Sequence, residues 1–196
     1  MLDAVHDIQT SYRKVIDSMA RPGSISNLVD EVKKWEGVSP CFPSTLLLAR
    51  MLLDTEVSFK VFSNQERPIT RFLHQLTYAK AVDTKHADFI FLLDDAPSGS
   101  LQLAVQEAKI GELMNPHTSA TIIVETNALS NEAVLSLRGP GIQEVSFVKV
   151  DVSEEWIAIR TDKNKEYPLG IDLIFVDREH QLLCLPRTTQ VIKEGR

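Results

Sequence analysis

The residues best suited to chemistry follow the last long apolar run of the chain. This run, 182–185, breaks at Pro186 into Arg187, Thr188 and Thr189. Proline cannot donate to a strand ladder, so the strand should end there and leave an arginine and two hydroxyl groups at its end. A guanidinium fork beside hydroxyl groups fits the oxygens of phosphate or phosphonate. These three polar residues are therefore the best candidates for anion binding.

Two other roles for Arg187 stay open. Asp172 lies within the preceding apolar run, and a carboxylate buried in a strand needs a partner or a shifted pKa. Arg187 could pair with Asp172 and hold the two apolar runs together. Arginine is also enriched in subunit interfaces, so Arg187 could contact a partner. The sequence thus predicts anion binding, a structural ion pair or an interface at this point.

Two glycine-containing segments are further candidates for a turn or a site. Arg21-Pro-Gly23 follows a helical pattern and first indicates a helix stop, with Arg21 as a second candidate for anion binding or an interface. Leu137-Arg-Gly-Pro-Gly-Ile142 superficially resembles a phosphate loop, but it lacks the Gly-Lys-Ser/Thr ending and precedes a strand rather than a helix. This second segment predicts a tight turn between strands.

Recognisable catalytic and metal-binding motifs are absent from the sequence. No two of the five histidines have metal-ligand spacing, and there is no nucleophile elbow or dinucleotide fingerprint. His6 and Asp7 could be a base and its orienting group, but adjacent helical residues point in different directions. Asp94 and Asp95 could face a metal, although a solvated turn is the simpler interpretation. We therefore expect no catalytic residue, no metal and no cofactor.

Composition limits the class of protein. The 196 residues are 43% hydrophobic and 24% charged, with a net charge of −6, which argues against a nucleic-acid binder. No apolar run is long enough to cross a membrane, and the first residues lack the basic start and apolar block of a signal peptide. Cys41 and Cys184 lie far apart in apolar surroundings, which is typical of buried thiols in a reducing compartment. We expect a cytoplasmic protein.

Hydrophobic periodicity predicts alternating helices and strands. Residues 3–19 form one amphipathic helical face, with Asp3 as its cap and Pro22-Gly23 as its end. The other expected helices are 46–53 capped by Ser44 or Thr45, 68–79, 100–110 stopped by Gly111, and one that starts between Ser153 and Trp156. The expected strands are 57–62, 88–93, 120–124, 133–137, 144–150 and a final pair around the turn 177–181. This order predicts a three-layer α/β fold with a mixed sheet in one domain, 1–196.

Motifs at both ends of the chain resemble one family. Pro168-Leu-Gly-Ile-Asp-Leu173 followed by Leu185-Pro-Arg-Thr-Thr189 is similar to the C-terminal signature of the PhnH family, the H subunit of the bacterial carbon–phosphorus lyase system. The opening motif is similar too, at Val5-His-Asp-Ile-Gln9, Tyr12-Arg13 and Met19-Ala-Arg-Pro-Gly23. Tyr12 and Tyr167 stand where the family often has Phe, and residues 24–85 match no motif of the family.

The resemblance implies an accessory role. It implies a fold like the large domain of pyridoxal-phosphate-dependent transferases, without the cofactor or its lysine, and a homodimer. It further implies work with the G, I, J and L subunits, which convert alkylphosphonate and ATP to alpha-D-ribose 1-methylphosphonate 5-triphosphate before C–P bond cleavage. We expect a subunit that is inactive alone. The alternatives are a phosphonate- or nucleotide-binding protein centred on Arg187, and a pyridoxal-type enzyme.

Overall fold

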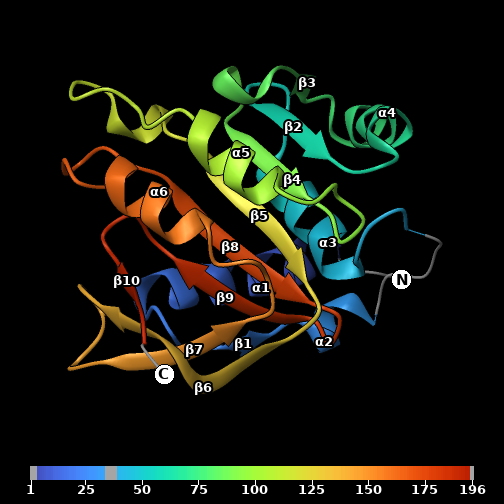
Figure 1. Ribbon diagram of the computed structural model, residues 1–196. Helices are drawn as coiled ribbons and strands as arrows, with labels where there is room; N and C mark the ends of the chain where they lie inside the picture. The colour runs from blue at the N-terminus through green and yellow to red at the C-terminus, as the bar shows by residue number, and fades with distance from the viewer. Residues whose placement is uncertain (1–3, 34–38, 195–196) are drawn as a thin grey trace.

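The structure is a computed structural model that describes residues 4–33 and 39–194, and it is a mixed α/β fold (Figure 1). The helices are α1 (Ala4–Ala20), α2 (Val29–Val32), α3 (Pro43–Leu52), α4 (Glu66–Thr77), α5 (Ser100–Glu107) and α6 (Trp156–Lys163), with 3-10 turns η1 (Thr84–His86) and η2 (Pro116–Thr118). The strands are β1 (Ser26–Asn27), β2 (Ser58–Phe62), β3 (Lys80–Ala81), β4 (Phe89–Leu92), β5 (Thr121–Thr126), β6 (Leu129–Arg138), β7 (Ser146–Val150), β8 (Asp172–Asp177), β9 (Gln181–Leu185) and β10 (Gln190–Lys193).

A seven-stranded mixed sheet runs through the centre of the molecule. Its order is β1-β9-β8-β5-β4-β2-β3, and β3, β2, β4, β5 and β8 are parallel. The hairpin β8–β9 and the short β1 add an antiparallel edge. The expected mixed sheet and the expected pairing of the two C-terminal runs are therefore confirmed.

Helices cover both faces of this sheet (Figure 1). One core gathers apolar side chains of α1 to α4 against β2, β4, β5, β8 and β9. The other gathers α5 and α6 against the opposite side of the same strands. The central strands are apolar on both faces because helices lie on both sides, as is usual for parallel sheets. The expected three layers are present.

A second, three-stranded antiparallel sheet shares one of these cores. Its order is β10-β6-β7. Leu137, Val148 and Val191 of this sheet are buried in the same cluster as Trp156 of α6 and Leu185 of β9. The turn Gly139-Pro-Gly141 joins β6 to β7, as the sequence predicts. The strand β10 was not expected, because Val191 is the only one of its four residues that is buried.

Two of the expected helix boundaries are wrong. Helix α3 starts at Pro43 with Phe42 as its cap, so Ser44 and Thr45 lie inside the first turn and not at the cap. Helix α5 ends at Glu107, since Ala108 is extended and Ala120 N–H then bonds to Lys109 C=O, so Gly111 does not stop it. The proposed Asp3 cap lies outside the described residues. No helix in the described ranges is long and apolar enough to cross a membrane.

Candidate functional site

The C-terminal motif is assembled by the register of the β8–β9 hairpin. Leu173 of β8 lies opposite Leu185 of β9, so the residues just beyond this pair meet at the same end of the hairpin. Asp172 Oδ1 accepts the backbone N–H of Arg187 at 2.7 Å and its Nε–H at 3.3 Å. Asp172 Oδ2 lies 2.5 Å from Arg187 Nη2. The ion pair that the sequence left as an alternative is present.

The guanidinium of Arg187 also ties two loops to the sheet. Its Nη1 donates to the carbonyls of Pro116 at 3.0 Å and Pro168 at 3.2 Å, and its Nη2 donates to the Ser119 hydroxyl. With the two bonds to Asp172, all five N–H donors of the side chain have protein acceptors. An anion could reach this group only by displacing one of them. This geometry favours the structural alternative, and anion binding at Arg187 stays a prediction.

A second arginine at the motif was missed by the sequence reasoning. Arg160 on α6 is only 2% exposed, and its guanidinium donates to the carbonyls of Leu185, Pro186 and Thr189 at 3.2, 2.6 and 2.9 Å. Burial lowers the pKa of Arg160 to about 10, and the charge of Asp172 opposes this shift. The signal in the sequence was weak, since an arginine between Ile159 and Thr161 is ordinary on an amphipathic helix.

The two arginines border a cavity of about 830 Å³, which we call the C-terminal cavity. Helix α6, the loop that follows it, the turn after β9 and strand β10 form its walls. Thr188 and Thr189 line it together with Arg187, so the structure brings these three predicted residues to one wall. Asp172 lies behind this wall, as the partner of Arg187.

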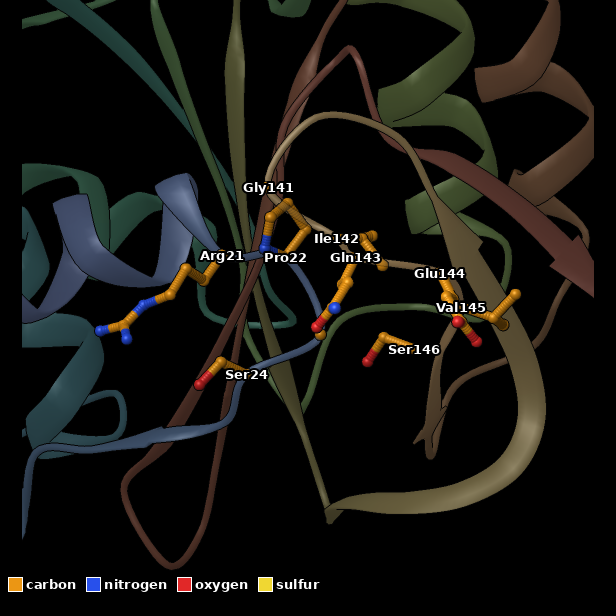
Figure 2. Close-up of a pocket in the computed structure, with 10 residues that line it drawn as sticks. Arg21, Pro22, Ser24, Gly141, Ile142, Gln143, Glu144, Val145 and Ser146 are labelled. Carbon is orange, nitrogen blue, oxygen red and sulfur yellow. The ribbon is translucent and has the colours of Figure 1, made fainter.

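Arg21 lies elsewhere, at a shallow cleft of about 510 Å³ between the end of α1 and the β6–β7 turn. Figure 2 shows its side chain extending away from Gln143, Glu144 and Ser146. Arg21 forms an exposed ion pair with Asp17, one helical turn earlier. The structure therefore does not bring Arg21 to the other predicted residues.

The same cleft shows why the N-terminal motif contains Pro-Gly. A Cβ on Gly23 would lie 2.2 Å from the Ser146 hydroxyl, and a Cβ on Gly141 would lie 2.1 Å from the carbonyl oxygen of Ala20. Both glycines also have positive φ. The end of α1 thus packs on the β6–β7 turn at a distance that only glycine permits.

A buried carboxylate lies at the carboxyl ends of the parallel strands. Glu125 is 5% exposed, and its oxygens accept the N–H groups of Phe42 at 2.6 Å and Asp94 at 3.0 Å. Burial raises the pKa of Glu125, and these two backbone donors oppose the shift. Because Phe42 caps α3, Glu125 supplies the acceptor that the start of that helix needs.

The remaining polar candidates do not form a metal site in the described part of the chain. Across residues 4–33 and 39–194 there is no group of three or more His, Cys, Asp or Glu that could hold an ion. Asp94 pairs with Arg178, and Asp95 accepts the Ser63 hydroxyl. His6 lies in α1, but its side chain is outside the described ones.

Comparison with known proteins identifies relatives along the whole chain. A family model described as bacterial phosphonate metabolism protein (PhnH) matches residues 1–192. HtxG of Stutzerimonas stutzeri, which is named as a C-P lyase subunit protein, is 26% identical over 190 residues, covering 95% of this chain and 87% of HtxG. The alpha-D-ribose 1-methylphosphonate 5-triphosphate synthase subunit PhnH of Rhizobium meliloti (strain 1021) is 27% identical over 196 residues, covering 98% of this chain and 94% of that subunit.

Proposed function

The chain belongs to the PhnH family of bacterial phosphonate metabolism proteins, and we propose that it is an accessory subunit of a carbon–phosphorus lyase system. The observation that carries this proposal is the match along the chain to two proteins named as subunits of such systems. The subunit would take part in the synthesis of alpha-D-ribose 1-methylphosphonate 5-triphosphate, the product in the name of one relative.

The geometry of the family-like motifs supports a role in assembly. The C-terminal motif holds two loops through Arg187, and the N-terminal motif packs α1 on the β6–β7 turn. These contacts shape surfaces and do not assemble a nucleophile with a base. We propose that the chain acts as one domain, 1–196, with other subunits of the G, I, J and L type, as a homodimer within the complex and in the cytoplasm.

Co-expression with the neighbouring phosphonate-metabolism subunits tests the proposal. Size-exclusion chromatography with light scattering should show a stoichiometric complex that contains this chain. A second run with the chain alone gives its own oligomeric state. Elution of the chain apart from every co-expressed subunit would overturn the proposal.

The pyridoxal-type enzyme is the competing proposal, and it follows only from the expected likeness to pyridoxal-phosphate-dependent transferases. Lys163 is the described lysine whose pKa burial lowers, and its ammonium already donates to the Ala108 carbonyl at 2.5 Å. A Schiff-base lysine needs such a lowered pKa. Absorbance near the aldimine band on adding pyridoxal phosphate, lost in a Lys163→Ala variant, would support this alternative.

A further inference from the structure

The C-terminal cavity contains a buried positive charge that no carboxylate of the described chain pairs with. The partners of Arg160 are three backbone carbonyls. Its Nε has no hydrogen-bond partner among the described residues, and the neighbouring Thr189 hydroxyl has none either. The charge of Asp172 acts on Arg160 without an ion pair between the two side chains, so an anion bound directly to Arg160 would stabilise this region further.

The other charges in the cavity wall are also positive. Lys165 and Arg187 line it, and no acidic side chain of residues 4–33 or 39–194 does. Asp172 neutralises Arg187, whereas Lys165 pairs with Asp162 at the surface, where both side chains are more than two-thirds exposed. Such an exposed pair contributes little free energy, so Lys165 can turn towards a ligand. With a pKa of about 10, Arg160 remains charged at neutral pH.

The rest of the wall is largely apolar. Tyr167, Leu169, Val191 and Ile192 line the cavity beside the cations. A volume of about 830 Å³ is in the size range of small-molecule sites and far exceeds what a bare phosphate ion occupies. The cavity therefore suits a ligand with an anionic head and an apolar body.

We propose that the C-terminal cavity binds an organic phosphonate or phosphate, with its head between Arg160 and Lys165 and its body against Tyr167 and Ile192. The choice of a phosphorus oxyanion over a carboxylate rests on the proposed function. The rest of the proposal follows from the charge and shape of the cavity. The bound group would give Arg160 a direct anionic partner in addition to the more distant charge of Asp172.

Isothermal titration of the full chain with phenylphosphonate tests this proposal. We expect saturable binding, and we expect inorganic phosphate and methylphosphonate to bind at least tenfold more weakly because they leave the apolar wall uncovered. No heat of binding with phenylphosphonate would overturn the proposal. Equal affinity for phenylphosphonate and inorganic phosphate would also overturn it, because it would indicate an adventitious ion only.

Two variants locate the site. Lys165→Glu should weaken phenylphosphonate binding at least tenfold, since an attractive charge becomes repulsive. Lys149→Glu is the matched control, because Lys149 also forms a surface ion pair, with Glu132, and is not part of the cavity wall. Equal affinities of these two variants would overturn the proposal. Arg160→Met should abolish phenylphosphonate binding if the variant folds. If it does not fold, the comparison of Lys165→Glu with Lys149→Glu tests the proposal.

The same samples separate this proposal from the proposed function. Wild-type chain that co-elutes with its partner subunits but does not bind phenylphosphonate would leave the subunit role standing and remove the ligand. Chain that binds phenylphosphonate through Lys165 but elutes apart from every partner would support the ligand site and overturn the subunit role.

Discussion

At the scale of single residues, Arg160 contacts the turn after β9 and Arg187 lies in it, but their charges are balanced in different ways. All five N–H donors of the Arg187 side chain bond to protein acceptors, and Asp172 is its carboxylate partner. Arg160 has three carbonyl acceptors, and its Nε–H has no hydrogen-bond partner in the described part of the chain. The first arrangement is typical of a structural residue, and the second leaves a buried charge without an ion-pair partner among the described residues.

Arg187→Lys tests the structural role. Lysine has three donors for the acceptors that five N–H groups now satisfy, and it cannot form the planar fork with Asp172. We expect the free energy of unfolding to fall by about 2–4 kcal/mol, since buried acceptors lose their partners. Urea denaturation measures this loss.

Arg178→Lys is the control for that variant. Arg178 pairs with Asp94 at the surface, where its side chain is 56% exposed, so the same replacement should change stability by less than about 1 kcal/mol. Losses of equal size in the two variants would contradict the structural role of Arg187.

Glu125 gives a prediction about pH. Its pKa in the folded state is raised above the ordinary value of 4.5 because burial disfavours the carboxylate. Between 4.5 and the folded-state pKa, the folded chain binds more protons at this site than the unfolded chain. The contribution of Glu125 to stability therefore falls as pH rises through this window.

Glu125→Gln removes this titration. The free energy of unfolding of the wild type minus that of Glu125→Gln should decrease from pH 4.5 upwards and then level off. Urea denaturation of both proteins at pH steps from 4.5 to 7.5 measures the difference, from which all other titrating groups cancel. A difference that grows with pH would show that the folded-state pKa is lowered.

At the scale of elements, the N-terminal motif is a contact between a helix end and a distant turn. Gly141→Ala would place its Cβ 2.1 Å from the Ala20 carbonyl oxygen, in a residue with φ of +85°. We expect the free energy of unfolding to fall by about 3 kcal/mol or more, because backbone strain and a steric clash add. Thermal or urea denaturation measures the loss.

Gly99→Ala separates the backbone strain expected in Gly141→Ala from its steric clash. Gly99 has a similar φ of +82°, but a Cβ there would have no described heavy atom within 4 Å apart from Gly99 itself and its two chain neighbours. This variant should lose only the cost of a left-handed alanine, about 1–2 kcal/mol. If both variants lost the same amount, the contact between α1 and the turn would contribute nothing.

The sequence predicted most of the regular elements because their apolar residues either recur at helical spacing or form unbroken runs. The apolar runs that predicted β5, β8 and β9 are buried in the structure. The face predicted for the helix over 3–19 is only partly correct, because Tyr12 and Ile16 are 50% and 48% exposed, whereas Ser11 and Ser18 are buried beside Val15. The sequence did not predict a helix start that depends on a residue far along the chain. Glu125 accepts the Phe42 N–H at the start of α3, and no local pattern near Phe42 reveals this.

The candidate site was predictable only in part, for the same reason. Asp172 inside an apolar run needed a partner, and the hairpin register made Arg187 the nearest one. Arg160 reaches the turn from α6. No pattern in the sequence predicts that α6 packs beside this turn. Its role depends on three carbonyls that appear only when α6 packs beside β10.

At the scale of the whole molecule, the loops that Arg187 ties together carry exposed apolar side chains. Leu113 and Met114 are 62% and 87% exposed, on the tight turn closed by Glu112 and Asn115. Tyr167, beside the Pro168 carbonyl that Arg187 holds, is 77% exposed. Exposed apolar side chains on a held loop are typical of surfaces that bind other proteins. We therefore expect this turn to contact a partner subunit in the proposed complex.

A double variant, Leu113→Asp with Met114→Asp, tests that contact. Both side chains are exposed, so the folded chain should keep its stability within about 1 kcal/mol, while a buried charge would disrupt the interface. Co-purification with the partner subunits should fall at least tenfold. Tyr78→Asp, at an exposed aromatic residue that ends α4, is the control and should leave co-purification unchanged. Equal recovery of the complex with both variants would show that the subunit binds its partners through another face.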